Sequence, residues 1–172
     1  MSYENFCGLC GEKSMGIETI HIMINWACAT FGQLTPEELY KILRLRSEVF
    51  VVEQQCVFLD MDNKDYHCHH LMGWQGDQLL GYSRIVPSGI SYTEFSIGRI
   101  VSSPAARGQG VGRELVQQSI ETLYHLYGKK DIRIGAQYHL REFYSSFGFV
   151  QKGDIYPEDG IDHVEMLLVV EA

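Results

Sequence analysis

The stretch SSPAARGQGVGREL, residues 102–115, places three glycines at alternate positions between a predicted strand and a predicted helix. The residues before it, FSIGRIV, are typical of a β-strand, and those after it carry apolar residues at helical spacing. Glycines cost conformational entropy in an ordered segment, so three together indicate a backbone that a ligand approaches closely. A helix N-terminus adds unpaired N–H groups and the positive end of its dipole. The stretch therefore predicts a loop that binds an anion, with a phosphate-bearing ligand as the first hypothesis.

The length and charge of the chain limit the classes of protein it can be. Its 172 residues are 45% hydrophobic and 21% charged, which indicates one globular domain. The net charge of −8 argues against nucleic acid as a partner and makes a cationic small molecule more natural. No apolar run is long enough to span a membrane, and no secretory signal is recognisable. Five cysteines without a disulfide pattern fit a cytoplasmic protein.

The first twenty residues differ from the rest because they show neither helical nor strand periodicity. We therefore expect residues 1–20 to form a flexible N-terminal extension and residues 21–172 to form the domain. Cys7 and Cys10 make a single CxxC pair, but a zinc site needs a second pair of ligands. We expect no function for this pair.

The rest of the chain predicts a mixed α+β domain, with a central mixed sheet and helices on both faces. Thr35 followed by proline and two glutamates marks a helix start. The expected strands are residues 21–31, the hairpin 70–86 with its turn at 75–78, 93–102, 131–137, 149–156 and 162–170. The expected helices are 36–54, 112–127 and 139–148.

The glycine stretch fits neither of two common phosphate-binding motifs. A P-loop needs a lysine and a hydroxyl residue after its last glycine, where this chain has Arg113 and Glu114. A dinucleotide fingerprint would need a third glycine at position 113. The stretch instead resembles the acyl-CoA pyrophosphate loop of the GCN5-related N-acetyltransferase (GNAT) superfamily, R/Q-x-x-G-x-G/A. Arg107, Gly110 and Gly112 match that motif position by position.

A second motif supports this resemblance. REFYSSFGF, residues 141–149, is similar to a later GNAT motif in which a helix carries Phe-Tyr and ends in Gly-Phe. The segments LRSEVFVVEQQC, HLMGW, IGRIV, GAQYHL and EDGIDH further resemble the bacterial ElaA-type subfamily over residues 23–170. The resemblance implies a GNAT fold with two splayed strands, acetyl-CoA as the acyl donor and an amine as the acceptor.

The resemblance also implies which residues bind the cofactor. The loop would hold the pyrophosphate through its backbone, and the strand before it would pair with the pantetheine arm. The residues expected to bind acetyl-CoA are Ile100, Val101, Ser102, Arg107, Gly108, Gln109, Gly110, Val111 and Gly112. A backbone N–H of Val101 or Ser102 is the expected donor to the oxyanion of the transition state.

The chemistry of acetyl transfer indicates two further roles. Tyr144 matches the tyrosine that stands near the thioester sulfur in the family, which makes it the expected general acid for the leaving thiolate. No motif fixes the base that takes the proton of the amine. His163 is the first choice because imidazole titrates near neutrality. Glu53, His70 and Glu94 are the further candidates around the acceptor side.

The segment DMDNKDYHCHH, residues 60–70, is rich in acids and histidines but does not predict a metal site. It lacks the glycine and the glutamate that an EF-hand needs, and His67, Cys68 and His69 would point to alternate sides of an extended segment. We expect no metal and interpret this segment as a solvated acidic loop that attracts a cationic amine.

Two functions remain open from the sequence. The first is an acetyl-CoA-dependent N-acetyltransferase that acts by direct transfer in a ternary complex. The alternative is a non-catalytic acyl-CoA-binding or regulatory module of the same fold. The expected partners are a small-molecule or peptide amine, with a homodimer as one option and with neither nucleic acid nor a membrane involved.

Overall fold

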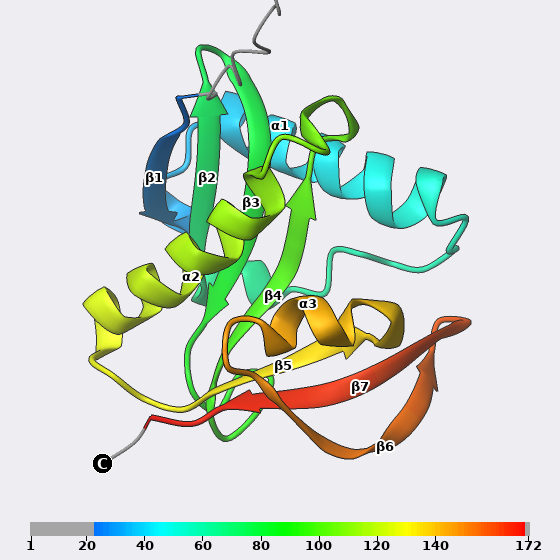
Figure 1. Cartoon of the computed structure of the whole chain (residues 1–172). Coiled ribbons are helices and arrows are strands. Elements are labelled where there is room, and N and C mark those ends of the chain that lie inside the picture. The colour runs from blue at the N-terminus through cyan, green and yellow to red at the C-terminus, as the bar shows by residue number, and fades with distance from the viewer. Residues whose placement is uncertain (1–22, 171–172) are drawn as a thin grey trace, which may run out of the picture.

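The structure is a computed structural model that describes residues 23–170 (Figure 1). The expected N-terminal extension and the pair Cys7 and Cys10 lie outside the described residues. The expected order of strands and helices is confirmed. The elements are β1 (Asn25–Thr30), α1 (Pro36–Arg46), β2 (His69–Gln75), β3 (Gln78–Val86), β4 (Phe95–Ser102), α2 (Val111–Tyr127), β5 (Ile132–Gln137), α3 (Arg141–Ser145), β6 (Val150–Glu158) and β7 (Ile161–Leu168).

The strands form one mixed sheet in the order β1-β2-β3-β4-β5-β7-β6. All neighbouring strands are antiparallel except β4 and β5, which are parallel. β4 and β5 pair only at Phe95 with Ile132 and at Ser96 with Arg133, and then diverge. Figure 1 shows the consequence: β1 to β4 lie roughly along one axis, with alternating directions, and β5 to β7 lie at a steep angle to that axis. The sheet therefore consists of two blocks joined along a short seam.

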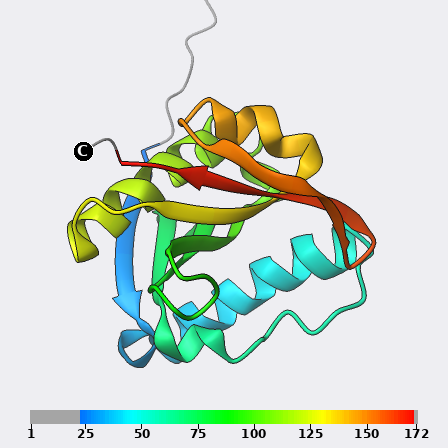
Figure 2. The ribbon, with the colours of Figure 1, turned by 90° about the horizontal axis from the view of Figure 1, so that it is seen from below.

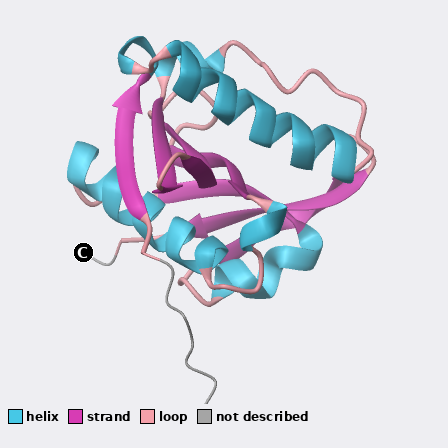
Figure 3. Ribbon diagram, turned by 90° about the horizontal axis from the view of Figure 1, so that it is seen from above, coloured by secondary structure: helices cyan, strands magenta, loops and turns pink. Residues whose placement is uncertain are grey.

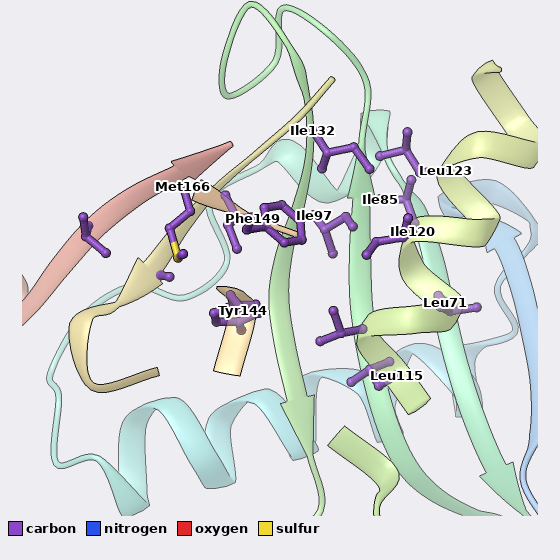
Figure 4. Packing of buried hydrophobic residues seen from close by; sticks show 14 residues of the cluster. Leu71, Ile85, Ile97, Leu115, Ile120, Leu123, Ile132, Tyr144, Phe149 and Met166 are labelled. Carbon is purple, nitrogen blue, oxygen red and sulfur yellow. The ribbon is translucent and has the colours of Figure 1, made fainter. Parts of the chain in front are cut away.

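Helices cover both faces of this sheet (Figure 3). Leu115, Ile120 and Leu123 of α2 pack on one face in a core that extends to β7 and to Phe149 after α3 (Figure 4). On the other face, Ile42 and Leu45 of α1 pack against apolar side chains of β2, β3 and β4. Side chains alternate between the two faces along each strand, so the central strands β2, β3 and β4 contribute apolar side chains to the core on both faces.

Helix α1 begins as the sequence predicts but ends differently. The Thr35 hydroxyl accepts the Glu38 N–H at 3.2 Å and the Glu38 carboxylate accepts the Thr35 N–H at 2.8 Å, a reciprocal capping arrangement. The single helix expected over residues 36–54 widens after Arg46 into π-helical turns over Ser47–Glu53. The Gln54 N–H donates to the Val49 carbonyl, five residues back, at 3.1 Å. Such widened turns rotate the side chains that follow, and they recur at functional sites.

The two C-terminal strands form a hairpin with a tight turn. Asp159 and Gly160 both have positive φ, 50° and 83°, which matches the twist of the flanking strands. The hairpin reaches beyond the rest of the sheet, and its tip lies beside the segment that follows α1 (Figure 2). There the Cys56 thiol donates to the Asp159 carbonyl at 3.2 Å.

The helix expected over residues 139–148 is shorter in the structure. α3 covers only Arg141–Ser145, and a 3₁₀ turn at Tyr138–Leu140 precedes it.

Candidate active site

A cleft opens where β4 and β5 diverge. It has a volume of about 780 Å³ and is bordered by β4 residues 97–102 on one side and β5 residues 134–137 on the other. The expected splay of these strands is therefore present. Diverging strands leave backbone N–H and C=O groups without partners, and these groups can bind a ligand that carries amides.

The edge of β4 presents two particular residues to this cleft. Ser103 N–H donates to the Leu80 carbonyl of β3 at 2.8 Å. The N–H and C=O groups of successive residues point to opposite edges of a strand. Those of Val101 therefore also point to β3, whereas those of Ile100 and Ser102 point to the cleft. Of the two oxyanion donors expected from the sequence, the geometry favours Ser102 over Val101.

A β-bulge interrupts β4 at Arg99 and Ile100. Tyr82 of β3 pairs with Val101 and Arg84 pairs with Gly98, so Ser83 of β3 faces both of these β4 residues. Arg99 has φ of 51°, a left-handed conformation that is uncommon for a residue with a side chain. Bulges of this kind turn a strand locally and are frequent beside functional sites.

The glycine loop lies at one end of the cleft. Gly108 and Gly110 have φ of 75° and 84°, and a Cβ added at either of them or at Gly112 would meet no atom within 4 Å. The glycines therefore leave open space rather than close packing. Gly110 precedes the first residue of α2, Val111, so the loop ends at the unpaired N–H groups of the first helical turn. This arrangement suits an anion.

Two cavities meet at this loop. Arg107 lines the cleft between β4 and β5. On the other side, a second cavity of about 660 Å³ is bordered by Gln109, Gly110, Arg113, Glu114, Gln117, Ser146 and Phe147. An elongated ligand whose anionic part rests on the loop can therefore extend into both cavities.

Arg107 binds a carboxylate that the sequence placed on the acceptor side. Its two Nη atoms donate to Glu53 Oε1 and Oε2 at 2.8 and 2.9 Å. Both side chains line the cleft and are a little under half exposed. The structure thus brings two of the predicted site residues together, in an ion pair.

Tyr144 of α3 lines the cleft and also belongs to the core cluster drawn in Figure 4. Its side chain is only 7% exposed and packs edge-on against Phe149. Burial raises the pKa of the Tyr144 hydroxyl to about 12. The phenol therefore keeps its proton at neutral pH and is available as a donor.

His163 lies on β7 and also borders the cleft. Its Nδ1 is 2.8 Å from the Ile161 carbonyl oxygen, which can only accept a hydrogen bond. In the neutral ring the proton therefore sits on Nδ1, and Nε2 carries the free lone pair. The ring stacks on Tyr156, whose centroid is 6.1 Å away. A lone pair held in this way can accept a proton.

The comparisons with known proteins agree with this geometry. The family model described as "Acetyltransferase (GNAT) domain" matches residues 32–170. The chain belongs to the GNAT family.

Similar proteins cover nearly all of the GNAT domain. Protein ElaA of Escherichia coli is 41% identical over 146 residues, 84% of this chain and 95% of ElaA, and its crystal structure matches with a TM-score of 0.79. The crystal structure of an acyl-CoA N-acyltransferase from Pseudomonas aeruginosa matches with a TM-score of 0.81 and 40% identity, over 84% of this chain and 99% of that one. A Bacillus subtilis acetyltransferase solved in complex with CoA shares the fold, with a TM-score of 0.59 and 20% identity over 87% and 100% of the chains. The expected GNAT fold and the likeness to ElaA are confirmed.

Two of the predicted site residues lie away from the cleft of this GNAT domain. His70 is 1% exposed, and its ring nitrogens are 2.8 Å from the Tyr82 hydroxyl and 3.1 Å from the Asp65 carbonyl. Burial lowers the pKa of His70. Glu94 accepts two hydrogen bonds from Arg133, at 2.6 and 3.0 Å, which lower the pKa of its carboxyl to about 2. Neither side chain borders the cleft, so the expected place of both at the acceptor side is corrected.

The acidic segment of the GNAT domain also differs from expectation, because its acidic side chains are paired with arginines. Asp60 and Asp65 are 6% and 7% exposed. Three arginines neutralise the segment, in the pairs Arg46 with Asp60 and Asp65, Arg84 with Asp62 and Asp65, and Arg99 with Asp60. Burial raises the pKa of Asp62 and Asp65, but their hydrogen bonds and charge interactions with these arginines outweigh it and hold both below the usual range. The segment therefore carries no free acidic surface of the expected kind.

Within residues 23–170, no group of three or more histidine, cysteine, aspartate or glutamate side chains has an arrangement that could hold a metal ion. In the same range, no helix is long and apolar enough to cross a membrane.

Several residues at the cleft were missed by the sequence interpretation. They are Phe58, Arg84, Tyr92, His139 and Glu158. Arg84 alone left a usable signal, because it lies within the apolar run of β3, where a charged group needs a partner. The others lie on loops, on a 3₁₀ turn or at the end of a strand, where no periodicity marks them.

Proposed function

We propose that the protein is an acetyl-CoA-dependent N-acetyltransferase that transfers the acetyl group directly to an amine in a ternary complex. One observation carries the proposal. Arg107 of the glycine loop, the cleft-facing edge of β4, Tyr144 and His163 all border the same cavity of about 780 Å³. An anion-binding loop, a free strand edge, a proton donor and a lone pair are the groups that this reaction needs.

The residues present fit acetyl-CoA in two ways. The loop from Arg107 to Gly112 offers backbone N–H groups without obstructing side chains, which suits a pyrophosphate. The backbone groups of Ile100 and Ser102 face the cleft and suit the amides of a pantetheine arm, as in the addition of a strand to a sheet edge. The CoA complex of the Bacillus subtilis acetyltransferase, which has the same fold, supports this assignment.

The proposed chemistry has three proton or charge movements. The amine nitrogen attacks the thioester carbonyl carbon and gives its proton to Nε2 of His163. The N–H of Ser102 donates to the carbonyl oxygen as that oxygen gains negative charge. The C–S bond then breaks, and the sulfur takes the proton of the Tyr144 hydroxyl. The products are the N-acetylated amine and free CoA. The proton taken up by His163 then returns through solvent to the Tyr144 phenolate, which restores both side chains.

The acceptor would approach from the side opposite the glycine loop. Glu158 at the end of β6 and Asp159 in the hairpin turn are exposed and border the cleft there. Their carboxylates favour an approaching cation. Phe58 provides an apolar surface nearby. We infer that the acceptor is a small-molecule or peptide amine.

The test is release of free thiol from acetyl-CoA in the presence of single amines, with the acetylated product identified by mass spectrometry. The panel should include amino acids, diamines, polyamines, aminoglycosides and short peptides with free N-termini. We expect turnover with at least one class, well above hydrolysis without amine. Tight binding of acetyl-CoA without turnover on any amine would instead favour the non-catalytic acyl-CoA-binding module.

A further inference from the structure

The segment between the π-helical turns and the next 3₁₀ helix connects the acceptor side of the cleft to the bulge in β4. We name residues 54–63 the strap. Cys56, Phe58 and Asp62 of the strap border the cleft, whereas Val57, Leu59 and Met61 are exposed. This alternation is that of an extended chain with one face toward the protein. The strap is therefore part of the cleft wall.

Asp60 attaches the strap to two separate elements. Its Oδ2 accepts the Nε–H of Arg46 on α1 at 2.7 Å, and its Oδ1 accepts the Nε–H of Arg99 on β4 at 2.6 Å. The Asp60 carbonyl also accepts a hydrogen bond from each guanidinium, at 3.0 and 3.1 Å. Arg46 is fully buried, so one side of this contact is fixed in the core. The other partner of Asp60, Arg99, is a residue of the bulge itself.

Arg99 is the residue that gives the bulge its shape. A left-handed conformation in a residue with a side chain persists only where the surroundings hold it. For Arg99 these surroundings include the two hydrogen bonds to Asp60 and the Phe58 ring, whose centroid is 5.7 Å from the guanidinium carbon. The carboxylate of Asp62 also lies 3.7 Å from Nη2 of Arg99. All three partners belong to the strap. The conformation of the bulge therefore depends on the position of the strap.

We infer that Asp60 and Arg99 are positioning residues that set the place of the cleft-facing edge of β4. Ile100 is the second residue of the bulge, and Ser102 follows two residues later. A shift of the strap moves Arg99, and through Arg99 it moves the backbone groups that would hold the acyl donor. The inference rests on the proposed function for its effect on turnover. The coupling between the strap and β4 is independent of that function.

The experiment uses two variants and a matched control. Arg99→Gly removes the guanidinium but tolerates the left-handed backbone, and Asp60→Asn removes the carboxylate charge while leaving β4 unchanged. Gln55→Gly is the control, because Gln55 is an exposed strap residue with φ of 52° and does not border the cleft. Arg99→Lys tests rescue by a shorter cation.

The first readout is hydrogen exchange of backbone amides in the protein without ligand. We expect faster exchange in residues 97–102 in both Arg99→Gly and Asp60→Asn, and an unchanged rate there in Gln55→Gly. The response to Asp60→Asn is decisive, because that substitution lies on the strap and not on the strand. Unchanged exchange in residues 97–102 of Asp60→Asn would overturn the inference.

The second readout separates positioning from support of the fold. We expect turnover on an accepted amine to fall about tenfold in Arg99→Gly, a size that a small misplacement can produce. The affinity for acetyl-CoA should fall much less, because the glycine loop still binds the pyrophosphate. Arg99→Lys should recover part of the loss. Equal losses of turnover and affinity would show general damage and overturn the inference. Changed exchange in a protein that acetylates no amine would uphold the coupling and reject only the proposed function.

Discussion

The carboxylate of Glu53 and the guanidinium of Arg107 meet in two parallel hydrogen bonds, although 54 positions separate them in the sequence. Arg107 is also the first residue of the glycine loop. A cation held by a carboxylate is less available to a phosphate, so Glu53 competes with an anionic ligand for Arg107.

Replacing Glu53 by glutamine should therefore strengthen acetyl-CoA binding by a few-fold at low salt. Both side chains are well exposed, and pairs of this kind contribute about 0–1 kcal/mol, so the free energy of unfolding should change little. Calorimetric titration at low and high salt checks both points, because screening should remove the gain. Weaker binding in Glu53→Gln would mean that the pair orders the loop for its ligand.

The bare backbone of the glycine loop should be necessary for acetyl-CoA binding. Gly110→Val places a branched side chain in the open space at φ of 84° and should raise the Kd about tenfold or more, which corresponds to about 1.4 kcal/mol. Gly76→Val is the matched control, because Gly76 also has positive φ and open surroundings but lies in the β2–β3 turn. Wild-type affinity in a folded Gly110→Val protein would remove the loop from the site.

The hydroxyl of Tyr144 should affect turnover and not binding. Tyr144→Phe keeps the ring packing, so acetyl-CoA affinity should stay near wild type while turnover falls about 10²-fold, the usual scale for a general acid. The loss should be smaller with acyl donors whose leaving thiol is more acidic. Tyr127→Phe serves as the control, since its hydroxyl bonds His69 at 3.0 Å outside the cleft. If Tyr144→Phe and wild type turned over equally fast with acetyl-CoA and with a donor of more acidic thiol, the assigned role would be contradicted.

His163 should affect turnover and not acetyl-CoA binding. His163→Gln removes the lone pair that would take the proton of the amine, so kcat should fall about 10²-fold while the affinity for acetyl-CoA stays near wild type. Steady-state rates on one amine and calorimetric titration with acetyl-CoA are the measurements. An unchanged kcat in His163→Gln would assign the base elsewhere.

Stability should fall as the pH drops below 6.5, because of His70. Its pKa is lowered from an ordinary value of 6.5 by burial, so the unfolded chain binds this proton first. The free energy of unfolding should thus be constant just above pH 6.5 and decrease below it. Asp62 and Asp65 have pKa values held below 3.8, so their contribution is lost only as the pH falls below about 4. Denaturant titrations of wild type and His70→Gln between pH 8 and 5 should show that the decrease disappears in the variant.

The element order and the glycine loop could be read from the sequence because their signals are local. Thr35 with Pro36 and Glu38 specifies a helix start within four residues, and the loop glycines lie within five. The splay of β4 from β5 came instead from the family resemblance. No periodicity reports how far two parallel strands stay paired.

The acceptor side of the cleft was harder to foresee, because its arrangement depends on contacts between distant residues. Asp60 meets Arg99 across 39 positions, and Asp65 meets Arg84 across 19. Without these partners, the acidic segment looked like a solvated loop. His70 illustrates the same limit. The family resemblance placed it around the acceptor cleft, whereas β2 is buried over His70–Gly73 and the His70 ring lies between the Tyr82 hydroxyl and the Asp65 carbonyl.

The two blocks of the sheet that meet at the short seam between β4 and β5 come from two consecutive parts of the sequence. Everything on one wall of the cleft, from β1 to the glycine loop and α2, is encoded before Gly128, and the opposite wall, with Tyr144 and His163, is encoded after it. Each wall is thus a continuous stretch of chain with its own hydrogen-bonded strands. A recombination event at this boundary would exchange β5 to β7, with Tyr144 and His163, while leaving the anion-binding loop and the strap intact.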